Sequence, residues 1–119
     1  MRSVNFDDIV AMQKSGRWDD AGRFLGDAAA GLERAGAECI LICAVTMHLV
    51  ADAVEAAVGV PFLHIIDATA KRLLDAGCRK PLLLATRYTM EDGFYQRRMA
   101  AHEWRWQCPM RPAATRRTP

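Results

Sequence analysis

Apolar residues along this chain recur with two spacings, one typical of helices and one of buried strands. From residue 18 to 35 they return every three or four positions, which predicts an amphipathic helix that ends at Gly36. A shorter helix is predicted over 8–14, with Asp7 as its N-cap. Three later helices are predicted over 47–58, up to residue 76 and over 90–102, the first two capped by Thr46 and Asp67 and closed by Gly59 and Gly77.

The apolar runs between these helices predict β-strands. Residues 38–43, 60–65 and 81–85 are apolar on both faces, as expected of strands in a parallel sheet that is covered on both sides. Residues 3–6 predict a short edge strand. Strands thus alternate with helices, which is the order of a parallel sheet with right-handed crossovers. The predicted fold class is α/β, a parallel sheet flanked by helices.

The periodic pattern stops near residue 101. Residues 1–101 are expected to form one partial α/β domain, since 119 residues correspond to a single domain by size. Residues 102–119 contain three prolines and lack a sustained helical or strand period. This tail is expected to be irregular, either disordered or the product of a shifted reading frame.

Charge and hydropathy exclude several classes of partner. The formal net charge is only +2, which gives no argument for nucleic-acid binding. No run of 18 apolar residues is present, so no membrane span is expected. Acidic residues near the N-terminus argue against a signal peptide, and a cytoplasmic location is expected.

The four cysteines are predicted to be free thiols. They are Cys39, Cys43, Cys78 and Cys108, and no two of them form a CxxC pair. On a strand, Cys39 and Cys43 would lie roughly 13 Å apart at about 3.3 Å per residue. That distance is too long for a disulfide or a shared metal ion, so no metal site is expected.

Cys43 is the strongest candidate for chemistry. It ends a predicted strand and precedes a predicted helix, and ligands of open α/β sheets bind beyond such strand ends. The partial positive charge of a helix N-terminus favours a thiolate there. The alternative is a small buried hydrophobe, which is the interpretation that we favour for Cys39. His48, in the first turn of that helix, could raise the thiolate fraction of Cys43 or could be a surface or supporting residue.

Three threonines and one arginine are further candidates. Thr46, Thr86 and Thr89 can cap helices, and the same positions can bind a carboxylate at a helix N-terminus. Arg87 could pair with the carboxylate of a ligand or be a solvated loop residue. His64, inside a predicted strand, is interpreted as structural or as lying at the edge of a cleft. No GxGxxG or other phosphate loop is present, so nucleotide binding has little support.

Several segments in a fixed order and spacing resemble one known family, the aspartate/glutamate racemases, which are cofactor-independent amino-acid racemases. The resemblance covers about residues 3 to 101. The segments that carry it are Ser-Val-Asn-Phe at 3–6, Arg-Ala-Gly-Ala at 34–37, Cys43-x-x-Thr46-Met47-His48, Pro-Phe-Leu-His-Ile at 61–65 with Asp67-Ala-Thr69, and Thr86-Arg-Tyr-Thr89-Met90-Glu91 followed by Phe94-Tyr95.

The resemblance implies a fold of two pseudo-symmetric α/β domains, of which this chain would be most of one. The active site of the family lies in the cleft between the domains, and each domain contributes one catalytic cysteine. Cys43 matches the first cysteine, Thr46 matches the carboxylate-binding turn, and Thr86 and Thr89 match a second such turn. The implied substrate is an amino acid, aspartate or glutamate. No cofactor is implied, because thiols replace the electron sink of a pyridoxal enzyme.

The chain departs from the family pattern in ways that bear on activity. Val45 stands where the family usually has asparagine, so it offers only its backbone N–H. The second catalytic cysteine has no counterpart, and the sequence is expected to be truncated at both ends. The isolated chain is therefore expected not to racemise. The alternative function is a catalytically inactive α/β fragment or interaction domain, and uncovered apolar edges predict self-association, such as a homodimer.

Overall fold

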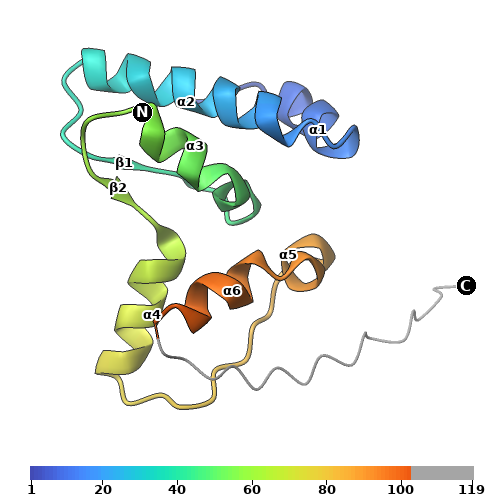
Figure 1. The fold of residues 1–119 in the computed structure, drawn as a ribbon, viewed down its shortest axis with the longest axis vertical. Coiled ribbons are helices and arrows are strands. Elements are labelled where there is room, and N and C mark those ends of the chain that lie inside the picture. The colour runs from blue at the N-terminus through green and yellow to red at the C-terminus, as the bar shows by residue number, and fades with distance from the viewer. Residues whose placement is uncertain (103–119) are drawn as a thin grey trace, which may run out of the picture. The chain divides into compact units, whose positions relative to one another are not determined.

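A computed structural model describes residues 1–102, and the chain divides into two compact units. The first unit comprises Met1–Ala68 and the second starts at Thr69 (Figure 1). The elements in chain order are α1 (Phe6–Lys14), α2 (Trp18–Arg34), β1 (Ile40–Leu41), the 3-10 helix η1 (Thr46–Val50), α3 (Ala51–Ala56), β2 (Phe62–Leu63), α4 (Ile65–Asp75), α5 (Arg87–Asp92) and α6 (Phe94–Ala100). The predicted α/β class is confirmed, in a form richer in helix than the sequence suggests.

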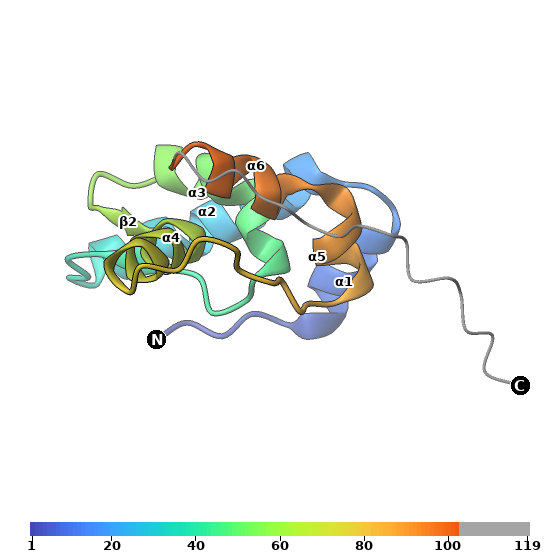
Figure 2. The ribbon, with the colours of Figure 1, turned by 90° about the horizontal axis from the view of Figure 1, so that it is seen from below.

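The sheet of the described residues consists of two parallel strands in the first unit. Ile40 pairs with Phe62 and Leu41 pairs with Leu63. The connection between the strands passes through η1 and α3, which makes a βαβ unit. The helices α2 and α3 lie side by side next to this pair of strands (Figures 1 and 2). One buried side chain from each of α2, β1 and α3 meets there: Ala29, Ile40 and Val54.

Four predicted strands are shorter than expected or missing. The predicted strands over 38–43 and 60–65 shrink to the two residue pairs of β1 and β2. Residues 81–85 are not a strand, although Leu82 and Leu84 alternate in exposure with their neighbours as strand residues do. Residues 3–6 are not a strand either. A strand exists only through its hydrogen-bonded neighbour, and within residues 1–102 these two segments pair with no strand.

The helices follow their predicted ranges more closely than the strands do. The helix α2 matches the predicted range, and Gly36 follows its C-cap with a φ of 99°, the left-handed conformation that favours glycine. The helix α1 begins earlier than predicted because Asn5, and not Asp7, caps it. The side-chain oxygen of Asn5 accepts a 3.0 Å hydrogen bond from the N–H of Asp7. Asp67 is not a cap, since α4 already begins at Ile65.

The predicted helix over 47–58 is composed of two parts. Its first turn is the 3-10 helix η1, and the α-helical part is α3. Thr46 is the first residue of η1 rather than its N-cap, a position that Val45 takes without a side-chain capping bond. The helix α3 ends before Gly59, whose N–H donates to the carboxylate of Glu33 on α2 at 3.1 and 3.2 Å. This bond attaches the end of the βαβ helix to α2.

Two glycines allow α2 and α3 to pack closely. A Cβ atom built on Gly22 would lie 2.9 Å from the Cβ of Ala53, and one built on Gly26 would lie 3.1 Å from the Cβ of Ala57. Both distances are shorter than the usual contact between carbon atoms of about 3.5–4.0 Å. The backbone of α2 therefore approaches α3 more closely than any other residue type would permit.

In the second unit, the predicted helix over 90–102 is interrupted. Gly93 has a φ of 84°, and the chain changes direction there between α5 and α6 (Figure 2). The helix α5 begins at Arg87, three residues before the predicted start, because Thr86 caps it, whereas Thr89 lies within the helix and is not a cap. The hydroxyl oxygen of Thr86 accepts from the N–H of Thr89 at 3.4 Å. Phe94, Tyr95 and Met99 of α6 are buried.

Two further sequence predictions concern a membrane span and the domain boundary at residue 101. Among the helices of residues 1–102, none has the length and apolar character that a membrane span requires. The predicted division after residue 101 stays a prediction, because the tail from 103 onward lies outside the described residues.

Candidate functional site

Cys43 lies in a turn between β1 and η1, which we define as the Cys43 turn, residues 43–46. Its side chain is exposed, whereas the residues on both sides of the turn are anchored. Ile42 packs against the two apolar cores of the first unit. Met47 is buried, and its sulfur accepts a 2.9 Å hydrogen bond from the side-chain amide of Gln13 on α1. The turn thus presents an exposed thiol on a backbone that is fixed at both ends.

His48 links the Cys43 turn to the start of α4. Its Nδ1 atom lies 2.9 Å from the carbonyl oxygen of Ala44, and its Nε2 atom lies 3.3 Å from the backbone nitrogen of Ile65. A carbonyl only accepts and a peptide N–H only donates, so Nδ1 carries the proton and Nε2 accepts. The ring is therefore neutral, and both of its nitrogens are bound to backbone groups.

Burial favours the neutral form of His48. Only 3% of the residue is exposed, and desolvation lowers the pKa of its imidazole below the ordinary value of 6.5. Hydrogen bonds with the backbone at Ala44 and Val45 raise the pKa by a smaller amount. A second buried imidazole, His64, lies with its ring centroid 4.8 Å away, and its Nδ1 accepts from the N–H of Ile66 at 3.2 Å.

We predict that the protein loses stability as the pH falls below about 6.5, because His48 binds a proton more readily in the unfolded chain. The contribution of its neutral ring is complete above that pH and decreases as the pH falls towards the lowered pKa of the folded state. Urea unfolding at pH values from 5 to 8 measures this slope. His48→Asn keeps a donor for Ala44 but removes the titrating group, so it should flatten the profile. Equal slopes in both proteins would contradict the prediction.

Val45 and Thr46 complete the turn. The carbonyl oxygen of Val45 accepts from the N–H of His48 at 3.0 Å, which closes the first turn of η1. Thr46 is half-buried. Only the backbone of Val45 can interact with a polar group, as expected from its aliphatic side chain.

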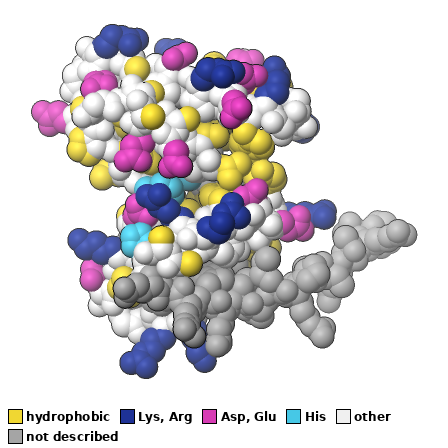
Figure 3. All heavy atoms as spheres, in the orientation of Figure 1, with side chains coloured by type: hydrophobic (Ala, Val, Ile, Leu, Met, Phe, Trp, Pro, Cys, Tyr) yellow, Lys and Arg dark blue, Asp and Glu magenta, His cyan; other side chains and the backbone are white. Residues whose placement is uncertain are grey.

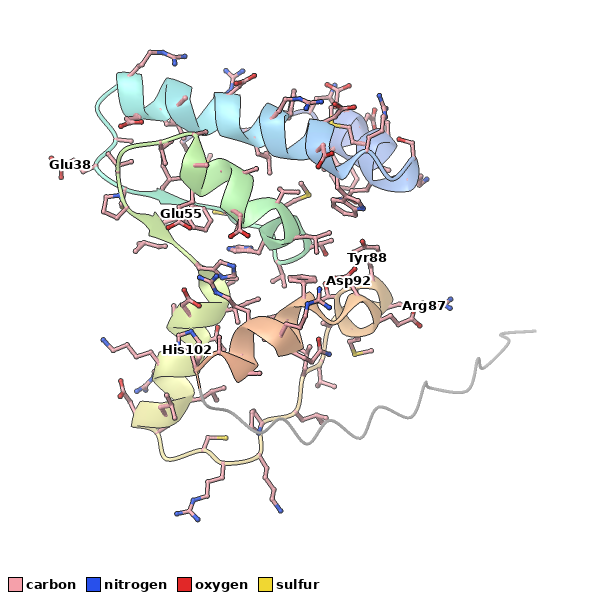
Figure 4. All side chains as sticks on the ribbon, viewed as in Figure 1. Glu38, Glu55, Arg87, Tyr88, Asp92 and His102 are labelled. Carbon is pink, nitrogen blue, oxygen red and sulfur yellow. The ribbon has the colours of Figure 1, made fainter. Side chains whose placement is uncertain are left out.

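The other predicted site residues belong to the second unit. Thr86 is exposed, whereas Thr89 is buried, and the hydroxyl of Thr86 donates to that of Thr89 at 3.2 Å. Arg87 is exposed and donates from Nε to the carboxylate of Glu91 at 2.9 Å, one turn along α5. It points away from its helix (Figure 4). Thr86 thus has a capping role, and Arg87 has an acidic partner on its own helix.

The structure gathers only part of the predicted site in one unit. Cys43, Val45, Thr46 and His48 share the first unit, whereas Thr86, Arg87 and Thr89 belong to the second. Cys39 is exposed, which corrects the prediction that it lies in the core; the sheet pairing starts only after it, at Ile40. Within residues 1–102 no cluster of three or more His, Cys, Asp or Glu residues is suited to a metal ion.

Two contacts of His48 were not predicted from the sequence. His64 lies just beyond β2 rather than within a strand, and it packs against His48. The backbone N–H of Ile65 becomes a partner of His48 only because α4 starts there. The surface charge of the first unit does not indicate a ligand, since acidic and basic side chains are mixed over the face shown in Figure 3.

Comparison with known proteins places the chain among racemases by similarity. The profile of the Asp/Glu/Hydantoin racemase family matches residues 1–119. The broad specificity amino-acid racemase RacX of Bacillus subtilis (strain 168) is 29% identical over 79 residues, which are 66% of this chain and 34% of RacX.

Two solved structures are similar to this chain in fold and sequence. A candidate Asp/Glu racemase from Yersinia pestis has a TM-score of 0.85 and 48% identity over 90% of this chain. An aspartate racemase homologue from Pyrococcus horikoshii OT3 has a TM-score of 0.80 and 41% identity over 91% of this chain. This chain covers 47% of each of these structures, and about a third of the curated relative.

Proposed function

We propose that this chain, which belongs to the Asp/Glu/Hydantoin racemase family, supplies one of the two acid–base groups of an amino-acid racemase. The group is the thiol of Cys43. As a thiolate it removes the α-proton of the substrate, so that a C–H bond breaks and an S–H bond forms. Return of a proton to the opposite face of the α-carbon then inverts the centre, and this step needs a second acid on that face.

The observation that carries this proposal is the exposed thiol at the carboxyl end of β1. A base that acts on a substrate must be accessible, and Cys43 is exposed while the residues on both sides of its turn are anchored. Ligands of parallel α/β sheets bind beyond this end of the strands. A fixed backbone also lowers the entropic cost of bringing the thiol to the α-carbon.

The substrate proposed is an acidic amino acid, aspartate or glutamate. Thr46, Thr86 and Thr89 are proposed to bind its carboxylate, with the backbone N–H of Val45 and the side chain of Arg87 in supporting roles. Of the three threonines, Thr86 is the exposed residue. The reaction as proposed needs no cofactor, because the two acid–base groups carry the proton directly.

A chain with one of the two groups should exchange the α-hydrogen without inverting the centre. None of the other cysteines stands in the sequence context of the second catalytic cysteine of the family. A proton removed by Cys43 would therefore return from Cys43, on the same face. In D2O the proton on the exposed thiol exchanges with the solvent before the return step, so the returned hydrogen is deuterium and the half-reaction becomes visible.

The test is to incubate the 119-residue chain with L-aspartate or L-glutamate in D2O. Proton NMR follows the loss of the α-proton signal, and chiral chromatography follows the appearance of the D-isomer. We expect deuteration with retention of the L-configuration. Full racemisation would overturn the single-base assignment, and the absence of any exchange with either substrate would overturn the proposed role of Cys43.

A further inference from the structure

We infer that His48 is a positioning residue, which holds the Cys43 turn in place through the carbonyl of Ala44 and connects it to the first residue of α4. The inference rests on the proposed function of Cys43 for its catalytic consequence. The claim that His48 holds the Cys43 turn does not depend on that function and has a test of its own.

The hydrogen bonds of His48 reach two distant parts of the chain. Ala44, the residue next to Cys43, precedes His48 by four positions, and Ile65 follows it by seventeen. The imidazole therefore bridges the carboxyl end of β1 and the beginning of the helix that follows β2. A displacement of α4 or of the turn would stretch one of the two bonds.

The ring is held in its orientation by packing as well as by hydrogen bonds. Its centroid lies 4.8 Å from that of His64 and 6.1 Å from that of Phe62, and the residue is almost completely buried. A ring enclosed in this way cannot rotate without breaking both bonds. The position of the Ala44 carbonyl is thereby fixed relative to β2 and α4.

A direct exchange of protons between His48 and Cys43 does not fit this geometry. Nδ1 donates to Ala44 and Nε2 accepts from Ile65, so the ring has no nitrogen left for the thiol. Of the two roles considered for this residue, the supporting one agrees with its contacts. His48 acts on Cys43 through the backbone, not as an acid or base.

Two substitutions separate the hydrogen bonds of the ring. The side-chain amide of asparagine overlaps the position of Nδ1, so His48→Asn can still donate to Ala44 but loses the bond to Ile65. The side-chain amide of glutamine overlaps the position of Nε2, so His48→Gln can accept from Ile65 but loses the bond to Ala44. The inference predicts that the loss of the bond to Ala44, the neighbour of Cys43, affects Cys43 more than the loss of the bond to Ile65.

In the α-deuteration assay, His48→Gln should lower kcat about tenfold or more while KM changes less than about twofold, because a misplaced base slows the proton transfer and not binding. His48→Asn, which loses only the more distant bond, should lower kcat by a smaller factor, up to about threefold. Circular dichroism confirms that each variant is folded under the assay conditions. Equal losses of kcat in both variants, or none in His48→Gln, would overturn the inference.

A second readout does not depend on racemase chemistry. The alkylation rate of Cys43 by iodoacetamide is measured by peptide mass spectrometry relative to that of Cys39, an exposed thiol in the same molecule. His48→Gln should change this ratio more than about threefold, and His48→Asn should not. If the chain exchanges no α-hydrogen but the ratio responds as described, the proposed function fails and the positioning role stands. An unchanged ratio in His48→Gln would overturn the positioning role.

A measurement on the unsubstituted chain covers the case in which both variants unfold. Nitrogen-15 NMR of the imidazole should show a protonated Nδ1 and an unprotonated Nε2 at neutral pH. The opposite tautomer could not donate to Ala44, and its observation would overturn the inference.

Discussion

Replacing Cys43 with alanine should reduce the exchange of the substrate α-hydrogen by about 10²–10⁴-fold, the usual contribution of a general base. A methyl group can neither take the proton nor return it. Cys43→Ser should lose nearly as much, because a serine hydroxyl is far harder to deprotonate than a thiol. The loss of the α-proton signal in D2O measures the rate, with L-aspartate or L-glutamate at saturating concentration.

Cys39 provides the matched control for this substitution. It is also an exposed cysteine of the first unit, and it lies just before β1, whereas Cys43 follows the strand. Cys39→Ala should keep the exchange rate and the melting temperature of the original chain. Exchange that survives in Cys43→Ala, or that disappears in Cys39→Ala as well, would show that another group removes the proton.

Sequence predicts the helices of this protein better than its sheet, and the reason is physical. The bonds of a helix join residues four apart, so the apolar spacing of α2 and the left-handed Gly36 are both local signals. The bonds of a strand depend on a distant segment. Residues 81–85 have the composition of a buried strand and remain unpaired within the described residues. Composition alone could not reveal that difference.

The candidate site shows the same division between local and distant information. That Cys43 lies between a strand and a helix follows from the local pattern, and the structure has β1 and η1 on either side of it. The bond between His48 and Ile65 joins residues seventeen positions apart, and it requires α4 to begin at Ile65. The sequence left open whether His48 acts on the thiol or supports the turn, because the choice depends on that distant contact.

Gly22→Ala should lower the free energy of unfolding by up to about 2 kcal/mol, because overpacking a core usually costs about 1–3 kcal/mol and alanine in a helix interior returns about 1 kcal/mol. The new methyl group would lie 2.9 Å from the Cβ of Ala53, so α2 and α3 would have to move apart. Gly26→Ala, at 3.1 Å from the Cβ of Ala57, should destabilise the protein less. Thermal unfolding followed by circular dichroism measures both changes.

Gly31→Ala, in the same helix, separates packing from helix propensity. Its Cβ would meet only the side chain of Arg34, at 3.6 Å, which is an ordinary contact. This variant should therefore be as stable as the original chain or up to about 1 kcal/mol more stable.

Because η1 continues directly into α3, separation of α3 from α2 should also disturb the Cys43 turn. Gly22→Ala should accordingly slow α-hydrogen exchange while Gly31→Ala does not, and a stable, fully active Gly22→Ala variant would contradict the close packing of the two helices.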